Sequence, residues 1–188
     1  MGGPSVGAAA AALRRGELVV HPTDTLFALA ARATDPAAVE RLLATKGRPT
    51  GRQLSVAVSS TEELEQWGRL SPAARRFVRA FLPGPYTVLL RPTAEARRQL
   101  SVAVAGGPRI GLRVPDHPVA RELARRAGPI TATSANRSGK PPARNLKEAR
   151  AALGTAVGVY LGGGPNPSGT PSRLFDLAGR KPTPLSRR

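Results

Sequence analysis

Short apolar runs alternate with segments of helical periodicity along the whole chain. The apolar runs predict strands over residues 17–20, 54–58, 86–91, 109–114, 130–133, 157–161 and 174–177. Apolar residues at helical spacing predict helices over residues 8–15, 36–46, 62–67, 73–81, 118–127 and 146–153. This alternation favours an α/β fold of the α+β type, in which helices flank a mixed sheet. Because no repeat or linker divides the chain, we expect a single domain over residues 1–188.

Capping residues mark the starts of three predicted helices. Asp35 precedes Pro36, and Ser71 precedes Pro72. Each pair places a side-chain acceptor directly before a proline, the order found at the first turn of a helix. Thr61 precedes two glutamates, which the positive end of a helix dipole favours. We therefore expect Asp35, Thr61 and Ser71 to be N-cap residues.

Composition excludes several classes of protein. A chain of 188 residues can bury about 70% of its unfolded surface, and with 4% aromatic residues its core must consist of Ala, Val and Leu. The absence of cysteine excludes disulfide scaffolds, thiol catalysis and Cys-ligated zinc, and two histidines exclude a His-rich metal site. No apolar run approaches the roughly 20 residues of a membrane span. Residues 1–12 lack the basic start of a signal peptide, so we expect a cytoplasmic protein.

The net charge of +17 has two explanations, and both stay open at this point. Of the 29 basic residues only four are lysine, and Ala, Gly and Pro are also abundant. Such a composition is typical of a GC-rich genome. A basic surface is equally typical of a protein that binds a polyanion, since neutralised phosphates release counterions. Charge alone does not choose between surface bias and a nucleotide or nucleic-acid partner.

Five polar clusters border predicted strands, where open α/β sheets bind ligands. They are residues 22–25, 46–49, 113–115, 134–136 and 162–172. Each cluster alone is also explained by a turn, a helix C-terminus or a plain connection. The glycine-rich cluster contains neither a Walker A nor a Gly-x-Gly-x-x-Gly pattern.

Taken in order, the motifs of this chain resemble those of the Sua5/YciO/YrdC family. The motifs are His21-Pro22-Thr23-Asp24-Thr25, Lys46-Gly47-Arg48-Pro49, Leu82-Pro83-Gly84-Pro85-Tyr86-Thr87, Gly111-Leu112-Arg113-Val114-Pro115-Asp116-His117-Pro118 and Ser134-Ala135-Asn136-Arg137-Ser138-Gly139. The resemblance covers nearly the whole chain and matches the short form of the family. It implies a twisted mixed sheet flanked by helices, with a basic concave groove.

The resemblance also implies an activity. Members of the family make L-threonylcarbamoyl-AMP from L-threonine, bicarbonate and ATP, and they release pyrophosphate. The product serves to form N6-threonylcarbamoyladenosine (t6A) at position 37 of tRNA. ATP, accompanied by Mg2+, is thus expected as a substrate, with no tightly bound cofactor and no resident metal. Expected partners include tRNA or double-stranded RNA and the t6A transferase proteins.

Residue by residue, the matching motifs imply a catalytic set of Lys46, Arg48 and Arg113. Lys46 and Arg48 would hold the triphosphate, and Arg113 would pair with the threonine carboxylate, a contact that suits a bidentate guanidinium. The threonine site would also include Thr25 and Ser134. The remaining implied residues lie toward the nucleotide, and they are Asn136, Arg144, Ser172 and Arg187.

The chain departs from the family pattern at residues 27–30 and 52–57, and the late segment 169–173 is also irregular. Residues 27–30 read Phe-Ala-Leu-Ala where the family has Tyr-Gly-Leu-Gly, which removes a hydroxyl and two glycines. Residues 52–54 read Arg-Gln-Leu, and Ala57 stands where some members carry histidine. Two alternatives therefore remain open: a non-catalytic RNA-binding protein that uses the same groove, and a carbamoyl-adenylate enzyme of the related carbamoyltransferase type.

Both histidines and two aromatic residues have structural interpretations. His117 stands directly before Pro118 at the start of a predicted helix, and His21 ends a predicted strand. We expect both to be structural rather than general bases. Trp67 and Phe77 lie at helical spacing and are expected in the core.

Overall fold

The computed structural model describes residues 3–48 and 53–186. The strands are β1 (Val19–His21), β2 (Ala28–Ala30), β3 (Ser55–Ala57), β4 (Gly68–Arg69), β5 (Tyr86–Pro92), β6 (Ile110–Arg113), β7 (Ile130–Ser134), β8 (Val159–Tyr160), β9 (Arg173–Asp176) and β10 (Thr183–Leu185). The helices are α1 (Val6–Arg14), α2 (Pro36–Lys46), α3 (Thr61–Trp67), α4 (Pro72–Phe81), α5 (Ala94–Gln99), α6 (Val102–Ala105), α7 (Pro118–Ala127) and α8 (Leu146–Leu153), with a 3-10 turn at Gly154–Ala156.

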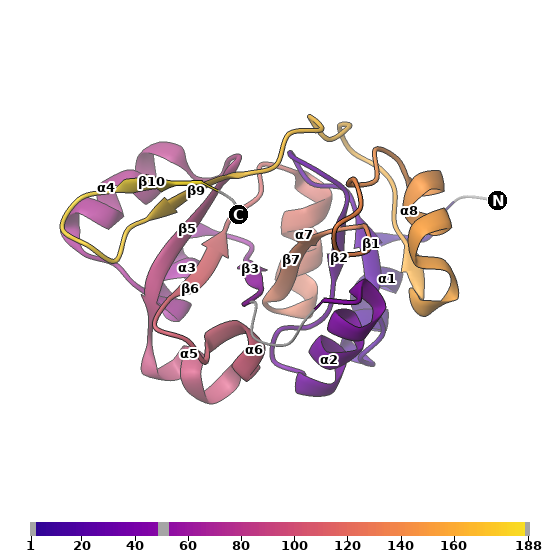
Figure 1. Cartoon of the computed structure of the whole chain (residues 1–188), viewed down its shortest axis with the longest axis horizontal. Helices are drawn as coiled ribbons and strands as arrows, with labels where there is room; N and C mark the ends of the chain where they lie inside the picture. Colours follow the sequence, from indigo (N-terminus) through magenta and orange to yellow (C-terminus); the bar gives the residue numbers. More distant parts are fainter. Residues whose placement is uncertain (1–2, 49–52, 187–188) are drawn as a thin grey trace.

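Over the described part of the chain, ten strands form one mixed sheet (Figure 1). Its order is β10-β9-β5-β6-β3-β7-β2-β1-β8, and β4 pairs with β5 off this path. The parallel pairs are β1–β8, β3–β6 and β5–β9, and the other neighbours are antiparallel. The expected α/β class, with helices around a mixed sheet, is therefore confirmed.

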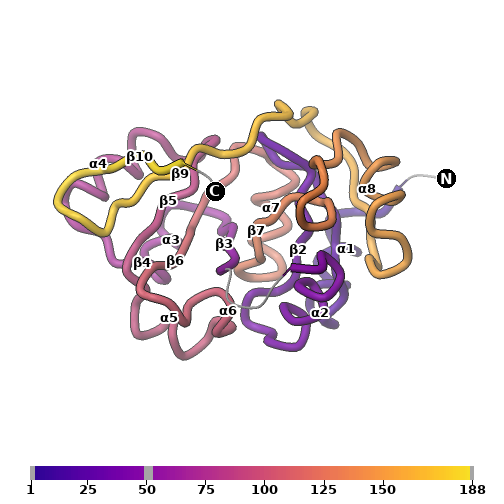
Figure 2. Tube along the Cα trace, viewed as in Figure 1, coloured from indigo at the N-terminus to yellow at the C-terminus, as the bar shows by residue number. Residues whose placement is uncertain are grey.

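Two strands from late in the chain form the edges of the sheet. β8 lies beside β1 at one edge, and β10 lies at the other. The connection over residues 161–172 consequently runs from one side of the molecule to the other, as the orange-to-yellow path in Figure 2 shows.

The sheet buries both of its faces. In β1, Val19 belongs to a cluster with α1 and α7, whereas its neighbour Val20 belongs to the larger core on the opposite face. This split follows from the two-residue period of a strand. The α1–α7 contact is made of small residues such as Ala9, Ala12 and Ala124, all fully buried, so the two helices approach closely.

Serine, aspartate and asparagine caps start most of the longer helices. Asp35 accepts a hydrogen bond from the Ala38 amide, and Ser71 accepts one from the Ala74 amide, so both expected caps are confirmed. The expectation for Thr61 is wrong by one residue. Ser60 caps α3 by accepting from the Glu63 amide, and Thr61 is the first helical residue.

Several short elements were not expected from the sequence: β2, β4, α5, α6 and β10. The strand expected over residues 157–161 is shorter, since β8 spans only Val159–Tyr160. Trp67 and Phe77 are buried in the core, as predicted. Within the described residues, no helix is both long enough and apolar enough to cross a membrane.

Candidate active site

A cavity of about 790 Å³ opens on the sheet face that α1 and α7 cover only in part. His21 lies two residues after Val19 on β1. On β7, Ala132 and Ser134 lie two and four residues after Ile130. Because alternate residues share a face, these side chains continue the face on which α1 and α7 pack and line the cavity beyond them.

The β1–β2 loop and the end of β6 meet at a buried ion pair. The Arg113 guanidinium donates to Asp24 Oδ1 at 2.6 Å and to Thr25 Oγ1 at 3.0 Å. The Arg113 and Asp24 side chains are 7% and 12% exposed, so water screens this pair little. Thr23 Oγ1 lies 3.0 Å from Thr25 Oγ1 and accepts hydrogen bonds from the amides of Thr25 and Leu26. These bonds hold the loop so that it presents Thr25 to Arg113.

Lys46 ends α2, and Gly47 follows with φ +60° in the left-handed region that stops the helix. The Lys46 ammonium donates hydrogen bonds of 2.6 Å to the carbonyls of both Ser134 and Asn136. Burial, and then the charge of Arg48, lowers the pKa of Lys46 to about 8. Lys46 therefore stabilises the turn after β7 through these two hydrogen bonds. Its side chain does not line the cavity.

The turn after β7 carries two of the expected site residues. Ser134 and Asn136 both line the cavity, and the Ser134 hydroxyl donates to Asn136 Oδ1. The Asn136 amide group donates in turn to the carbonyls of Arg137, at 3.0 Å, and Lys140. The amide orientation is thus fixed by the backbone around it.

On the opposite wall, Ser172 and Thr87 share a hydrogen bond of 2.8 Å between their hydroxyls. Arg48 lines the cavity from the segment after α2 and donates to the Gln53 carbonyl at 3.1 Å. Arg48 and Arg113 are the cations of the described lining, which contains no carboxylate side chain. The wall is suited to an anionic ligand.

The structure brings together most of the expected site residues. Thr25, Arg48, Arg113, Ser134, Asn136 and Ser172 line one cavity, and Lys46 lies directly behind it. Arg144 is exposed and does not line the cavity. It lines a smaller adjoining hollow of about 250 Å³, which shares Pro142 with the cavity. Arg187 falls outside the described residues, as do residues 49–52.

The two histidines occupy different surroundings. His117 is the N-cap residue of α7, and its Nε2 pairs with the Pro165 carbonyl at 2.9 Å, which agrees with its structural interpretation. His21 lines the cavity, fully buried, with Nδ1 3.0 Å from the Pro22 carbonyl. Burial lowers the pKa of His21 to about 4, so its ring is neutral at pH 7.

The altered segment at residues 27–30 is an ordinary strand. Ala28 to Ala30 form β2, and no described residue other than glycine has a positive φ, so the alanines cause no backbone strain. Phe27 and Ala28 line the cavity. The departure therefore changes the shape of the wall rather than the backbone.

The motifs assigned no role to two contributors to the site, Asp24 and Thr87. Asp24, the partner of Arg113, stands at the variable position of Pro-Thr-x-Thr, where its charge beside two threonines was the available signal. Thr87 lies in the matched Pro-Gly-Pro-Tyr-Thr motif. The glycine-rich segment crosses the β1–β2 loop, where the Gly169 amide donates to the Thr25 carbonyl at 2.8 Å.

No group of three or more His, Asp or Glu side chains that could hold a metal ion occurs within residues 3–48 and 53–186.

The Sua5/YciO/YrdC family model, described as telomere recombination, matches residues 11–188. A curated protein of Mycobacterium tuberculosis (strain CDC 1551 / Oshkosh) is 39% identical over 178 residues, which covers 94% of this chain and 81% of that protein. The threonylcarbamoyl-AMP synthase of Chromohalobacter salexigens is 37% identical over 171 residues and covers 90% of each chain.

Among solved structures, P. abyssi Sua5 complexed with L-threonine superposes with a TM-score of 0.87 at 31% identity and covers 96% of this chain. The present chain spans about half of that longer protein, 53% of its length. The match of the family model thus takes in all the loops and strand ends that meet at the cavity, and the chain belongs to the Sua5/YciO/YrdC family.

Proposed function

We propose that this protein is an L-threonylcarbamoyladenylate synthase. It makes threonylcarbamoyl-AMP and pyrophosphate from L-threonine, bicarbonate and ATP, in the cytoplasm, for t6A formation at position 37 of tRNA. The observation that carries this proposal is Arg113. Its guanidinium lies at the end of β6 in a cavity large enough for a nucleotide, between hydroxyl groups and without a carboxylate in the described lining. The names of the curated relatives support the same activity.

The chemistry suits a site with no cysteine and a neutral buried histidine. The threonine amine and bicarbonate form a carbamate with loss of water, and one carbamate oxygen attacks the α-phosphorus of ATP. The bond between that oxygen and phosphorus forms, the bond from phosphorus to the bridging oxygen breaks, and pyrophosphate leaves. Because the carbamate is already anionic, the step needs no strong base. It needs positioning of two anions and neutralisation of charge on phosphate.

The side chains divide between the two substrates. Arg113 takes the threonine carboxylate in a bidentate contact, while Thr25 and Ser134 donate or accept at the threonine side. Asn136 and Ser172 lie toward the nucleotide. Arg48 contacts the triphosphate, and Lys46 adds positive charge from behind the 134–136 turn. Mg2+ travels with ATP. Arg144 and Arg187 are also proposed to contribute to ATP binding.

The solved complex of P. abyssi Sua5 with L-threonine supports threonine as the amino acid. The charge of +17 supports a contact with tRNA, and the product requires delivery to the t6A transferase proteins. We further propose that residues 1–188 act as one domain with a basic groove at the cavity.

A radiochemical assay tests the proposal. The purified chain is incubated with ATP, Mg2+, labelled threonine and bicarbonate, and pyrophosphate and labelled adenylate are measured. We expect both products, and expect neither when threonine or bicarbonate is omitted. A folded protein that yields neither product contradicts the proposal. Adenylate formation that depends on carbamoyl phosphate instead of threonine would establish the carbamoyl-adenylate alternative.

A further inference from the structure

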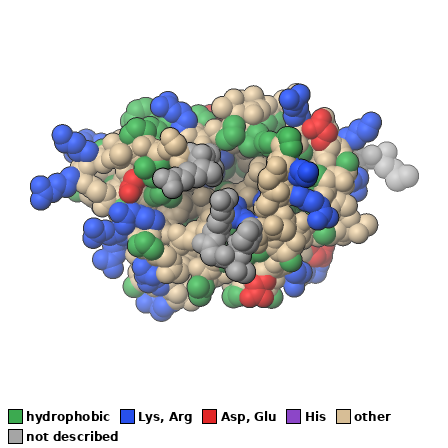
Figure 3. All heavy atoms as spheres, in the orientation of Figure 1, with side chains coloured by type: hydrophobic (Ala, Val, Ile, Leu, Met, Phe, Trp, Pro, Cys, Tyr) green, Lys and Arg blue, Asp and Glu red, His purple; other side chains and the backbone are tan. Residues whose placement is uncertain are grey.

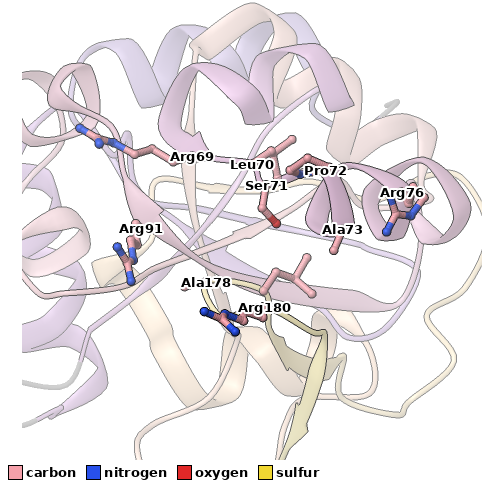
Figure 4. A pocket seen from close by; sticks show the side chains of 11 residues that line it. Arg69, Leu70, Ser71, Pro72, Ala73, Arg76, Arg91, Ala178 and Arg180 are labelled. Atoms are coloured by element: carbon pink, nitrogen blue, oxygen red, sulfur yellow. The ribbon is translucent and has the colours of Figure 1, made fainter.

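A further hollow, of about 670 Å³ and distinct from those already described, lies between the start of α4, the end of β5 and the turn after β9. Four arginines line it, together with small and apolar residues (Figure 4). We call these residues the arginine pocket: Arg69, Arg76, Arg91 and Arg180. Each comes from a different element, namely β4, α4, β5 and the turn after β9. In Figure 4 they surround Ser71 and Ala73.

The arginine pocket has no internal charge balance. No carboxylate of the described residues lines it, and none of its four guanidinium groups forms an ion pair with a described residue. Other arginines of the chain do find partners. Arg75, next in sequence to Arg76, pairs with Glu65 at 2.8 Å, and Arg98 pairs with Glu95. The four positive charges at this hollow are therefore not neutralised by a described carboxylate.

The strand register adds a second, independent observation. Arg69 on β4 is directly opposite Arg91 on β5 in an antiparallel pair. Directly opposed residues project from the same face of a sheet, with Cβ atoms about 5 Å apart, and like charges at such positions destabilise the pairing. An anion that lies between the two guanidinium groups removes this repulsion.

The arginine pocket is separate from the active-site cavity, but strand β5 contributes residues to both. The two hollows share no lining residue. Thr87 and Leu89 line the cavity, and Arg91 lines the pocket two residues further along β5. The distance from Thr87 to Arg91 along the strand is about 13 Å. A ligand of the arginine pocket would thus lie beside the catalytic site without entering it.

We propose that the arginine pocket binds consecutive phosphates of an RNA backbone. Arginine presents a planar fork that matches phosphate oxygens, and four such groups around an open hollow fit a chain of phosphates better than one small anion. Figure 3 shows Lys and Arg side chains gathered at the end of the molecule that carries α4. The choice of RNA as the polyanion rests on the proposed function in tRNA modification.

Binding of a tRNA transcript, measured by fluorescence anisotropy across a salt titration, tests the proposal. The double variants Arg69→Gln/Arg91→Gln and Arg76→Gln/Arg180→Gln are compared with the wild type. We expect each to weaken binding about tenfold or more at 100 mM salt. Each should also lower the slope of log affinity against log salt by about two, because two phosphates are no longer neutralised by an arginine.

The matched control is Arg75→Gln/Arg98→Gln, which removes the same charge from two arginines that are already paired with glutamates. We expect it to change tRNA binding less than threefold. An equal loss in the control, or a wild type that does not bind tRNA, overturns the proposal. Threonylcarbamoyl-AMP synthesis is assayed separately without tRNA and should be unchanged in the pocket variants. A wild type that binds tRNA through this pocket but makes no adenylate would contradict only the proposed function.

Discussion

At the scale of single residues, the ion pair between Arg113 and Asp24 dominates the candidate site. Both side chains are nearly buried, at a separation of 2.6 Å. The guanidinium is therefore already oriented before any ligand arrives. Removal of one partner of a buried pair leaves the other without compensation, a change that costs about 3–5 kcal/mol.

Arg113→Ala should lower kcat/KM for threonine by about 100-fold or more, since the variant cannot form the charged bond to the substrate carboxylate. The KM for ATP should change much less. Arg113→Lys keeps the charge but not the fork, so it should recover only part of the activity. The measurement is threonine-dependent release of pyrophosphate.

Two control variants distinguish a loss of catalysis from a loss of folding in this experiment. Arg113→Ala/Asp24→Asn removes the uncompensated charge and should restore thermal stability without restoring activity. Arg109→Ala removes a half-exposed arginine that pairs with Asp176 at 3.4 Å near the start of β6, and it should leave kcat/KM unchanged. Wild-type threonine kinetics in folded Arg113→Ala would refute the assignment.

The proposed role of Lys46 in ATP binding predicts that activity is sensitive to alkaline pH. Its pKa of about 8 means that the ammonium is lost as pH rises through 8 in the folded protein, whereas the unfolded chain keeps it up to about 10.5. We expect kcat/KM for ATP to fall above about pH 8. Lys46→Arg, with a pKa well above that range, should move this limb upward. The measurement is the pH profile of kcat/KM for ATP in the wild type and the variant. If the alkaline fall occurs at the same pH in both, a group other than Lys46 causes it.

Unfolding does not explain that loss. Between pH 8 and 10.5 the unfolded chain holds a proton at Lys46 that the folded chain has released, so the contribution of this residue to stability rises with pH. Lys140→Arg provides a matched control on an exposed lysine. It should leave the pH profile of the wild type intact.

At the scale of elements, α1 and α7 show how alanine replaces aromatic residues in this core. Ala9 is fully buried between the two helices, whereas its neighbour Ala8 is exposed. Ala9→Leu adds three carbons to a closed contact and should lower the free energy of unfolding by about 1–3 kcal/mol. Ala8→Leu adds the same atoms to the surface and should change it by less than about 0.5 kcal/mol. Urea denaturation of both variants decides, and equal effects would mean that the contact is loose.

The sequence was most informative where local chemistry decides the element. Asp35-Pro36 and Ser71-Pro72 fixed two helix starts correctly, because the acceptor and the proline both act within one turn. At α3 two adjacent residues could serve as cap, and the wrong one was chosen. Local chemistry locates such a start to within one residue.

The missed elements depend on distant partners. β2 consists of Ala28, Leu29 and Ala30, residues of weak strand propensity, and it is held between β1 and β7. β10 contains Pro184 and is exposed throughout, so only its pairing with β9 defines it. Tertiary pairing overrides propensity at these positions, and no pattern within the segments indicates it.

The site shows the same division. Five side chains of the ordered motifs line one cavity, since strand ends bring loops together; they are Thr25, Arg48, Arg113, Ser134 and Asn136. The motifs did not indicate that Lys46 faces two backbone carbonyls, or that Arg144 lies in another hollow. The direction of a side chain depends on packing that a motif does not encode.

At the scale of the whole molecule, the buried neutral His21 links stability to acid pH. Its pKa is about 4 in the folded protein and 6.5 in the unfolded chain, so the unfolded chain binds more protons between these values. Stability that His21 contributes is present above pH 6.5 and is lost as pH falls toward 4, by about 2 kcal/mol at pH 4.5. His21→Gln should remove this part of the pH dependence.

Urea denaturation at pH 7 and pH 4.5 measures the effect as a difference of differences. The wild type should lose about 2 kcal/mol more than His21→Gln between the two pH values, because carboxylates contribute equally to both proteins. An equal loss in both would show that the His21 ring gains a proton as readily in the folded state as in the unfolded state.

The topology of the sheet also sets the order in which the molecule can be completed during synthesis. Both edges, β8 and β10, come from the last thirty residues of the described chain. The segment between them carries Ser172 and the Gly169 amide, which donates a hydrogen bond to the Thr25 carbonyl. β1 pairs with β2 on one side, but its neighbour on the other side, β8, is about 140 residues away, since Val19 is in register with Val159. Such distant pairings slow folding. A nascent chain on the ribosome that has exposed every motif up to residue 139 therefore still lacks both borders of its sheet and one wall of its pocket, and it gains a complete site only when the end of the chain emerges.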